Sequence, residues 1–389
     1  MGELAEIKDS ARIPNAEWSD FGVPYIRTSD ITNEDASGVL FISHERYEFY
    51  KNKTGAPAKG DVLFNGGGEI GKTMLNSSDS PIYVQGGAVL YARTSVSDSL
   101  DGQYLKTYFE TPNAQHYFET ASAGGTMKHF TLKPSQEMPI IIPQMEEQKR
   151  IGECFSELDT LITLHQRKYE KFVNIKKSML DKMFPKNGDL YPEVRINGFT
   201  KVWERRKLGD VMEIISGNAW RSSDYSDDGE YLVITIANVS GEVFINDKIG
   251  NHISCDNPNK YLLNENDILL SMTGNVGRVS KMPKIRGVLN QRVGKIVPIS
   301  DSISTEFLFH VLKNPNFESA MIDAGKGAAQ KNISNSDVLS YSFYMPLEIK
   351  EQQNIASCFD KLDDLIMLHW YEYMKLVRIK YALLKSLFV

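Results

Sequence analysis

The sequence predicts an α/β protein in which two mixed domains, related by pseudo-twofold symmetry, are separated by two long helices that form an antiparallel coiled coil. Three observations support this fold class. The chain is internally duplicated, with an offset of 204 residues between Ile151 and Ile355. Each copy begins with short β-rich runs, such as 61–64 and 293–297, that alternate with turn residues. Each copy ends in a long segment with helical heptad periodicity.

The duplication is traced by matched motifs in the mixed segments. The matched pairs are 59–64 with 265–270, 68–72 with 274–278, Gln85 with Gln291, Lys128 with Lys331, and Pro143 with Pro346. A period near 200 residues is too long for a solenoid repeat, so we interpret the chain as a duplicated two-part module. The predicted boundaries are 1–145 for the first mixed domain, 146–186 for the first helix, 187–206 for a linker, 207–345 for the second mixed domain and 346–389 for the second helix.

Two helical seams are predicted, in which large or apolar residues recur in alternating steps of four and three. The first seam contains Ile151, Phe155, Leu158, Ile162, His165 and Tyr169, and continues through Lys176 to Met183. The second contains Ile355, Phe359, Leu362, Ile366, His369 and Tyr373, and continues through Lys380 to Leu387. At about 1.5 Å per residue each seam spans roughly 50 Å, which a single helix cannot bury alone. We predict that the two helices pair; the alternative is that each packs on its own domain or on another subunit.

Composition limits the class of protein. Hydrophobic residues make up 41% of the chain and charged residues 24%, as in a soluble globular protein. The sequence contains neither an apolar run long enough for a membrane span nor a signal-like N-terminus, which predicts a cytoplasmic location. The three cysteines lack metal-ligand spacing. With a net charge of −6, binding to nucleic acid would require positive charge to be concentrated locally.

Such a concentration exists between Asp267 and Asp301, where no acidic residue occurs. The basic residues inside this window are Arg278, Lys281, Lys284, Arg286, Arg292 and Lys295. Any one of them could be an ordinary solvated charge, but the cluster indicates an anionic partner.

Together, the duplicated Pro…Glu-Gln…Ile…Phe…Leu-Asp…His helices and the paired Gly-x-hydrophobic-Gly-Lys/Arg turns resemble the specificity subunit of type I restriction–modification enzymes. The lead-in before the second domain, from Asn197 through Trp203 to Gly209, is also similar to that family. The first copy departs from the pattern, because it starts at Gly2, the counterpart of Gly209.

The resemblance implies a non-catalytic subunit that binds double-stranded DNA. Each mixed domain would be a target-recognition domain that reads one half of a bipartite site. The helices would set the spacing and dock two modification (methyltransferase) subunits, and restriction (endonuclease/translocase) subunits would join them. S-adenosylmethionine, ATP and Mg²⁺ would then bind to the partner subunits, with no cofactor in this chain.

Candidate DNA-binding residues follow from this expectation and from residue chemistry. Asn, Gln and Arg pair bidentately with base edges, which favours Asn290, Gln291 and Arg292 as base readers. Phosphate contacts are predicted for Lys281, Lys284 and Arg286. Arg278 is a further DNA-binding candidate, and the first domain offers Lys72, Gln85 and Arg93. Two matched glycine-rich loops, 123–129 and 325–331, add Lys128, His129, Lys326 and Lys331.

Two motifs suggest enzymatic alternatives. Residues 66–73, which begin at Gly66 and end in Lys72-Thr73, fit a phosphate-binding P-loop and would make the chain a nucleotide-binding enzyme. That chemistry requires a helix to start at Lys72-Thr73, whereas a turn follows at 76–81. Asn314-Pro315-Asn316-Phe317 resembles a motif of adenine methyltransferases, but the matched Thr111-Pro112 favours a helix start in both copies.

Overall fold

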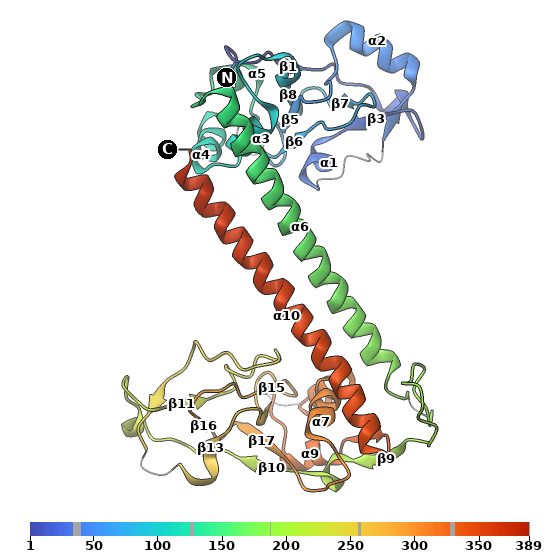
Figure 1. Ribbon diagram of the computed structural model, residues 1–389, viewed down its shortest axis with the longest axis vertical. Helices are drawn as coiled ribbons and strands as arrows, with labels where there is room; N and C mark the ends of the chain where they lie inside the picture. Colours follow the sequence, from blue (N-terminus) through green and yellow to red (C-terminus); the bar gives the residue numbers. More distant parts are fainter. Residues whose placement is uncertain (34–39, 125–127, 187, 256–257, 327–330, 389) are drawn as a thin grey trace. The chain divides into compact units, whose positions relative to one another are not determined.

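The computed structural model describes residues 1–33, 40–124, 128–186, 188–255, 258–326 and 331–388. The chain divides into two compact units. Unit 1 comprises Met1–Arg167 and Trp370–Val389, and unit 2 comprises Lys168–His369. The two long helices, α6 (Met145–Lys182) and α10 (Ile349–Ser386), each contribute to both units (Figure 1). No helix among the described residues is both long and apolar enough to cross a membrane.

Unit 1 contains two four-stranded sheets. One is antiparallel, in the order β1 (Ile7–Asp9), β8 (Val89–Ala92), β5 (Val62–Asn65), β6 (Thr73–Leu75). The other has the order β2 (Trp18–Ser19), β4 (Phe41–Ile42), β3 (Val23–Ile26), β7 (Tyr83–Val84), with β3 and β7 parallel. The helices of the mixed domain are α1 (Thr28–Thr32), α2 (His44–Thr54), α3 (Gly102–Phe109), α4 (Pro112–Ala121) and α5 (Leu132–Glu137).

Unit 2 repeats the strand order of the antiparallel sheet, whereas the parallel strand pair is central in its second sheet and at one end of the second sheet in unit 1. Its antiparallel sheet has the order β10 (Met212–Ser216), β17 (Val293–Pro298), β14 (Ile268–Ser271), β15 (Val279–Lys281). The second sheet has the order β12 (His252–Ile253), β11 (Tyr231–Ile234), β16 (Gly287–Leu289), β13 (Leu262–Leu263), with β11 and β16 parallel. The helices of the domain are α7 (Thr305–Leu312), α8 (Pro315–Ala324) and α9 (Asn335–Ser340), and β9 (Glu204–Lys207) pairs with β18 (Ser342–Met345).

Local chemistry explains where the matched helices begin. Thr111 caps α4 by accepting a hydrogen bond from the Ala114 amide, and Asn314 caps α8 by accepting from the Asn316 amide. A proline occupies the first turn of each helix, where no amide donor is needed. The side-chain Nδ2 of Asn314 also donates to the Leu180 carbonyl of α6 at 3.2 Å. The interpretation of the Asn-Pro motif as a helix start is therefore confirmed.

Contacts within each unit show that α6 and α10 pair antiparallel. In unit 1 the Phe155 ring lies 6.0 Å from that of Phe388, and the Lys380 ammonium lies 2.5 Å from the Asp159 carboxylate. In unit 2 Phe172 stacks on His369 with ring centroids 5.6 Å apart, and Lys176 pairs with Asp363. Residue numbers thus rise along α6 as they fall along α10. The predicted coiled coil is confirmed.

The predicted seam residues face inward along both helices. The buried members are Phe155, Met183, Ile355, Phe359, Leu362 and His369. The remaining seam residues named in the prediction, from Ile151 to Tyr373, are partly buried. The last predicted position of the second seam is wrong: α10 ends at Ser386, Leu387 is 49% exposed, and Phe388 enters the core of unit 1 in its place. The heptad rule fails there because the chain no longer has helical geometry beyond the helix end.

A polar cluster of one buried histidine, one largely buried lysine and one partly exposed carboxylate joins the mixed domain of unit 2 to α10. The fully buried His310 donates from Nε2 to the Asp360 carboxylate at 2.9 Å, and Lys281 lies 3.6 Å from the same carboxylate. The other ring nitrogen, Nδ1, is buried and has no hydrogen-bond partner among the described residues. Burial lowers the pKa of His310 below its usual value, because the charged ring would lose its hydration.

This cluster makes the stability of unit 2 depend on pH. The folded state keeps His310 neutral, whereas the unfolded chain takes up a proton below its ordinary pKa of about 6.5. Protons therefore favour unfolding, and this contribution to the free energy of unfolding is expected to fall by up to about 1.4 kcal/mol per pH unit below pH 6.5. Urea denaturation between pH 7 and pH 5 should show a shallower pH slope for His310→Gln. Equal slopes for both proteins would contradict the assignment.

Candidate nucleic-acid interface

A glycine-rich turn joins β5 to β6 in unit 1 and β14 to β15 in unit 2, and its backbone hydrogen bonds are the same in both units. In unit 1 the Asn65 amide donates to the Lys72 carbonyl at 2.9 Å and the Gly71 amide to the Asn65 carbonyl at 3.1 Å. In unit 2 the Ser271 amide donates to Arg278 and the Gly277 amide to Ser271 at the same distances. The structure thus places Lys72 and Arg278 at equivalent positions, each directly before an outer strand.

Two glycines of this turn have structural roles. Gly71 and Gly277 have φ angles of 82° and 84°, a conformation that favours glycine. A Cβ on Gly71 would lie 2.7 Å from the Phe118 ring of α4, and one on Gly277 would lie 2.9 Å from Met321 of α8. The glycine pattern that suggested a P-loop is therefore explained by a tight β-hairpin that packs against a helix. Thr73 begins the strand β6, so no helix N-terminus is available to hold phosphates there.

A second loop, which follows the parallel strand pair, differs between the units. The Gln85 amide donates to Ile26 at 2.8 Å, and the Asn290 amide donates to Ile234 at 3.1 Å. The structural counterpart of Gln85 is therefore Asn290, and the predicted match with Gln291 is wrong by one residue. The shift arises because the loop of unit 1 is one residue longer. Ala88 of unit 1 is equivalent to Arg292 of unit 2: the Ala88 carbonyl accepts from the Gly66 amide, and the Arg292 carbonyl accepts from the Met272 amide.

In unit 2 this loop borders a polar hollow of about 550 Å³. Its walls come from β10, from the turn after β14, from the loop before β17 and from the start of α9. The lining residues are Ser216, Met272, Thr273, Gln291, Arg292, Val293, Asn332, Ile333, Ser334 and Asn335. Gln291 and Arg292 are exposed, and the Arg292 guanidinium makes no ion pair with any described residue. Two predicted base readers thus lie together, next to additional amide and hydroxyl groups.

Hydrogen bonds between segments that are distant in sequence hold part of the lining of this hollow. Thr273 Oγ1 donates to Asn332 Oδ1 at 2.9 Å, and the Gly274 amide donates to the Lys331 carbonyl at 2.9 Å. Lys331 itself is exposed beside the hollow. Sequence reasoning missed Asn332 and Asn335, because only the tertiary structure brings the segment after the second glycine-rich loop to this place.

Apart from Lys284, the other basic residues of the acid-free window have carboxylate partners from outside the window. Arg278 lies 3.6 Å from Glu318, Arg286 pairs with Glu230, and Lys281 is only 13% exposed where it contacts Asp360. Lys281 also lies 4.4 Å from the Phe309 ring centroid, which favours a structural role. Lys284 is exposed, and the structure shows no ion pair between it and a described residue.

In unit 1 three of the predicted DNA-binding residues are exposed side chains near the glycine-rich segments. Lys72, Lys128 and His129 are exposed, and His129 pairs through its backbone with Ala123. The His129 ring borders Gly67, since a Cβ there would lie 3.4 Å from Nδ1. Lys72 and His129 therefore lie at the turn of unit 1 that is equivalent to the turn beside the hollow in unit 2.

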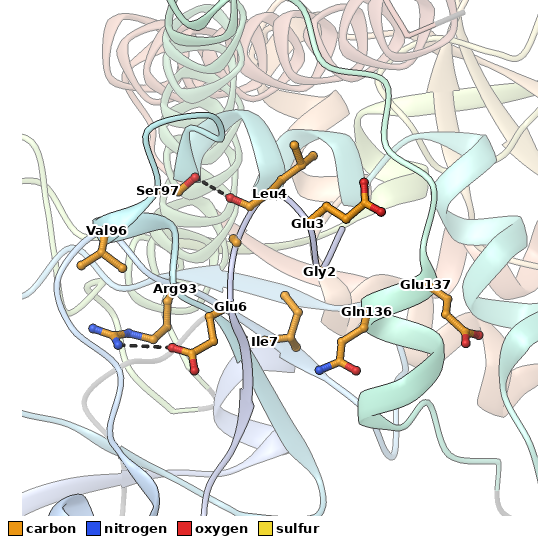
Figure 2. A pocket seen from close by; sticks show the side chains of 11 residues that line it. Gly2, Glu3, Leu4, Glu6, Ile7, Arg93, Val96, Ser97, Gln136 and Glu137 are labelled. Atoms are coloured by element: carbon orange, nitrogen blue, oxygen red, sulfur yellow. Dashed lines mark hydrogen bonds and ion pairs between the residues drawn. The ribbon is translucent and has the colours of Figure 1, made fainter.

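Arg93 lies in another pocket, which Figure 2 shows from close by. Its guanidinium is directed at Glu6, with a separation of 3.4 Å. Glu3 and Glu137 also line this pocket, so carboxylates outnumber the single cation. Such a lining disfavours an anionic ligand, and this position argues against a phosphate contact by Arg93.

The glycine-rich loops are described only in part, since residues 125–127 and 327–330 lie outside the described residues. Lys326, at the edge of the second loop, pairs with Asp323 at 2.6 Å. No group of three or more His, Cys, Asp or Glu side chains suited to a metal ion occurs among the described residues.

The fold and these loops define a class of protein: a duplicated α/β module with two long paired helices, in which one scaffold carries a different loop surface in each copy. Residues 1–172 and 200–372 match the family described as the type I restriction modification DNA specificity domain. The chain belongs to this family.

Individual relatives agree with this assignment. The chain is 26% identical over 280 residues to the type I restriction enzyme MjaVIII specificity subunit of Methanocaldococcus jannaschii, covering 69% of this chain and 64% of that protein. It is 25% identical to the putative MjaX specificity subunit of the same organism, covering 79% and 72%. The crystal structure of the type I restriction–modification S subunit from M. genitalium has the same fold, with a TM-score of 0.67, 15% identity and coverage of 100% and 94%.

Proposed function

We propose that this chain is a sequence-specific DNA-binding specificity subunit in which residues 1–145 and 207–345 each read one half of a bipartite site. The observation that carries the proposal is the contrast between a repeated scaffold and a changed loop. The hydrogen bonds of the glycine-rich turns after β5 and β14 are the same in both units, whereas Arg292 of unit 2 is replaced by Ala88 in unit 1. Two domains that recognise different DNA sequences need the same scaffold but different side chains on the surface that contacts the DNA.

In unit 2 the base-reading surface is the polar hollow. Arg292 and Gln291 are long enough to reach base edges in a major groove, and both pair bidentately with purines. Asn335 and Ser216, which line the same hollow, add shorter polar groups. Lys284 and Lys331 in unit 2, and Lys72 and Lys128 in unit 1, are exposed cations suited to phosphates.

The paired helices serve as the spacer and as the docking surface for two methyltransferase subunits. Support comes from large apolar side chains that the helix pairing leaves exposed. Leu164 is 43% exposed, and its counterpart Leu368 is 52% exposed. Trp370 and Tyr371 are exposed on α10 as well. Exposed aromatic and aliphatic side chains of this size are typical of protein–protein contact surfaces.

Catalysis in this proposal belongs to the partners. The methyltransferase subunits would bind S-adenosylmethionine and the restriction subunits ATP and Mg²⁺, while this chain supplies the choice of sequence. The P-loop alternative has lost its structural support, because residues 66–73 form a hairpin turn ahead of β6.

A methylome tests the proposal. The chain would be expressed with its methyltransferase subunit in a host without adenine methylation, and N6-methyladenine would be mapped across the genome. The expected result is one split motif, with two short specific halves around a non-specific gap. Absence of methylation by a complex verified as assembled would contradict the proposal, and ATP binding would then be measured on the isolated chain.

A further inference from the structure

One glutamine in the first turn of each long helix makes the same three hydrogen bonds in both units. In unit 1 Gln148 Oε1 accepts from the Asp101 amide at 3.0 Å, while Nε2 donates to the carbonyls of Ser99 and Pro143, both at 3.0 Å. Both side-chain atoms are thus fully used. Gln148 is 1% exposed.

Unit 2 repeats the arrangement at the matching residue. Gln352 Oε1 accepts from the Ser304 amide at 2.8 Å, and Nε2 donates to Ser302 at 2.8 Å and to Pro346 at 2.9 Å. Gln352 is completely buried. The repetition is notable because the mixed domains differ in their loops, while this set of partners is preserved.

The partners belong to segments that meet where the mixed domain joins its helix. Asp101 and Ser304 are the N-cap residues of α3 and α7, which are helices of the mixed domains. Pro143 and Pro346 lie in the connections to α6 and α10. One carboxamide therefore ties the domain, the connection and the long helix together. A carboxylate could not replace it, since it would accept from the amide but place negative charge against two carbonyl oxygens.

Other polar contacts between helix and domain differ in the two units. In unit 2 Glu351 is buried between Arg195, at 2.7 Å, and the Trp203 indole nitrogen, at 3.2 Å. Its counterpart Glu147 in unit 1 is exposed. In unit 1 Lys106 reaches Asp159 at 3.3 Å, whereas unit 2 uses His310 and Asp360. The glutamine contact is shared despite these differences, which indicates a requirement common to both units.

We propose that Gln148 and Gln352 are positioning residues that fix the angle of each recognition domain on its helix and thereby the gap length accepted between the two half-sites. The inference rests on the proposed bipartite reading. A domain that rotates on its helix moves its reading surface along the DNA, and a shift of one base pair is only about 3.4 Å. Loss of the carboxamide would therefore broaden the accepted gap without altering either half-site.

The test compares methylomes of the assembled methyltransferase complexes of the full chain and its variants. In Gln352→Glu, methylation at sites whose gap is one base pair longer or shorter is expected to rise about tenfold relative to the normal gap, the size of effect that one or two lost hydrogen bonds produce. Both half-site sequences should remain unchanged. Gln148→Met, in the other unit, should broaden the gap in the same way, so the test does not depend on one variant.

Asn238→Asp is the matched control. Asn238 is also completely buried; its Oδ1 accepts from the Thr235 amide and its Nδ2 donates to the carbonyls of Asn246 and Ile249, all at 2.8 Å. These partners lie within the mixed domain of unit 2, so this substitution imposes the same chemical change without touching the join to α10. The complex with Asn238→Asp is expected to methylate sites of a single gap length, even if total methylation falls.

The outcomes separate the two proposals. Lower methylation with an unchanged single gap in both glutamine variants would overturn the positioning role and leave the proposed function intact. Equal broadening in Asn238→Asp would also overturn it, because general loosening of a domain would then suffice. A wild-type methylome without a split motif would instead refute the bipartite reading on which the inference rests.

Discussion

Replacement of Asp363 by leucine (Asp363→Leu) is expected to destabilise unit 2 by about 3–5 kcal/mol, the usual effect of leaving a buried charge unpaired. Asp363 pairs with Lys176, and the two side chains are only 8% and 13% exposed. Lys313 lies near enough to interact with Lys176 and is partly buried, and desolvation lowers the pKa of its ammonium. Without the carboxylate, the charges of these two lysines would repel each other without compensation from Asp363. Urea denaturation at pH 7, followed by circular dichroism, measures the free energy of unfolding.

The chain supplies its own comparison for this experiment. Asp159 and Lys380 form the matching pair in unit 1, but these side chains are 29% and 18% exposed, and Lys380 also contacts Glu110 at 2.5 Å. Asp159→Leu should therefore cost less than Asp363→Leu. The double variant Lys176→Met/Asp363→Leu should recover most of the loss, because no unpaired charge of this pair remains. Equal losses for the two single variants would show that burial does not determine the effect.

Substitution of Arg292 by alanine (Arg292→Ala) is expected to weaken recognition of one half-site by about 1–3 kcal/mol, which corresponds to roughly 5- to 150-fold in affinity. The side chain is exposed at the polar hollow of unit 2, and its carbonyl, which the substitution keeps, holds the loop by accepting from Met272. Binding of the assembled complex to duplexes with a scrambled first or second half-site would measure the effect. Only discrimination at the half-site read by unit 2 should change.

Lys284→Ala is the control for Arg292→Ala. Lys284 is an exposed cation on the same domain but does not line the hollow. Its removal should weaken binding about equally on all duplexes and lower the slope of log affinity against log salt by about one. If Arg292→Ala showed this uniform behaviour, Arg292 would be a phosphate contact and the base-reading assignment would be wrong.

The sequence predicted the helices and their pairing well. A heptad seam is a local property, because residues three and four positions apart lie on one helix face whatever surrounds them. For this reason Phe155, Phe359 and Leu362 were identified as interface residues from spacing alone, and they are buried. The prediction failed only at Leu387, beyond the end of the helix.

The charge pattern of the sequence predicted DNA-binding residues less well than the heptad pattern predicted the helices. The window between Asp267 and Asp301 looked uniformly basic, yet Arg278, Lys281 and Arg286 meet Glu318, Asp360 and Glu230 from elsewhere in the chain. Folding neutralises a basic segment whenever acidic residues remote in sequence are brought within a few ångströms. This effect leaves Arg292 and Lys284 as the members of the window available to a partner.

The sequence by itself determined the duplication, the two long helices and the resemblance to the specificity subunits, because each depends on local periodicity or on motifs repeated in order. Only the tertiary structure decided which residues share a surface. It joined Thr273, Arg292 and Asn332 around one hollow, shifted the match of Gln85 to Asn290, and gave Gln148 and Gln352 their three partners. Such contacts join segments as much as about 60 residues apart, and side-chain reach and strand register, which sequence spacing does not specify, determine them.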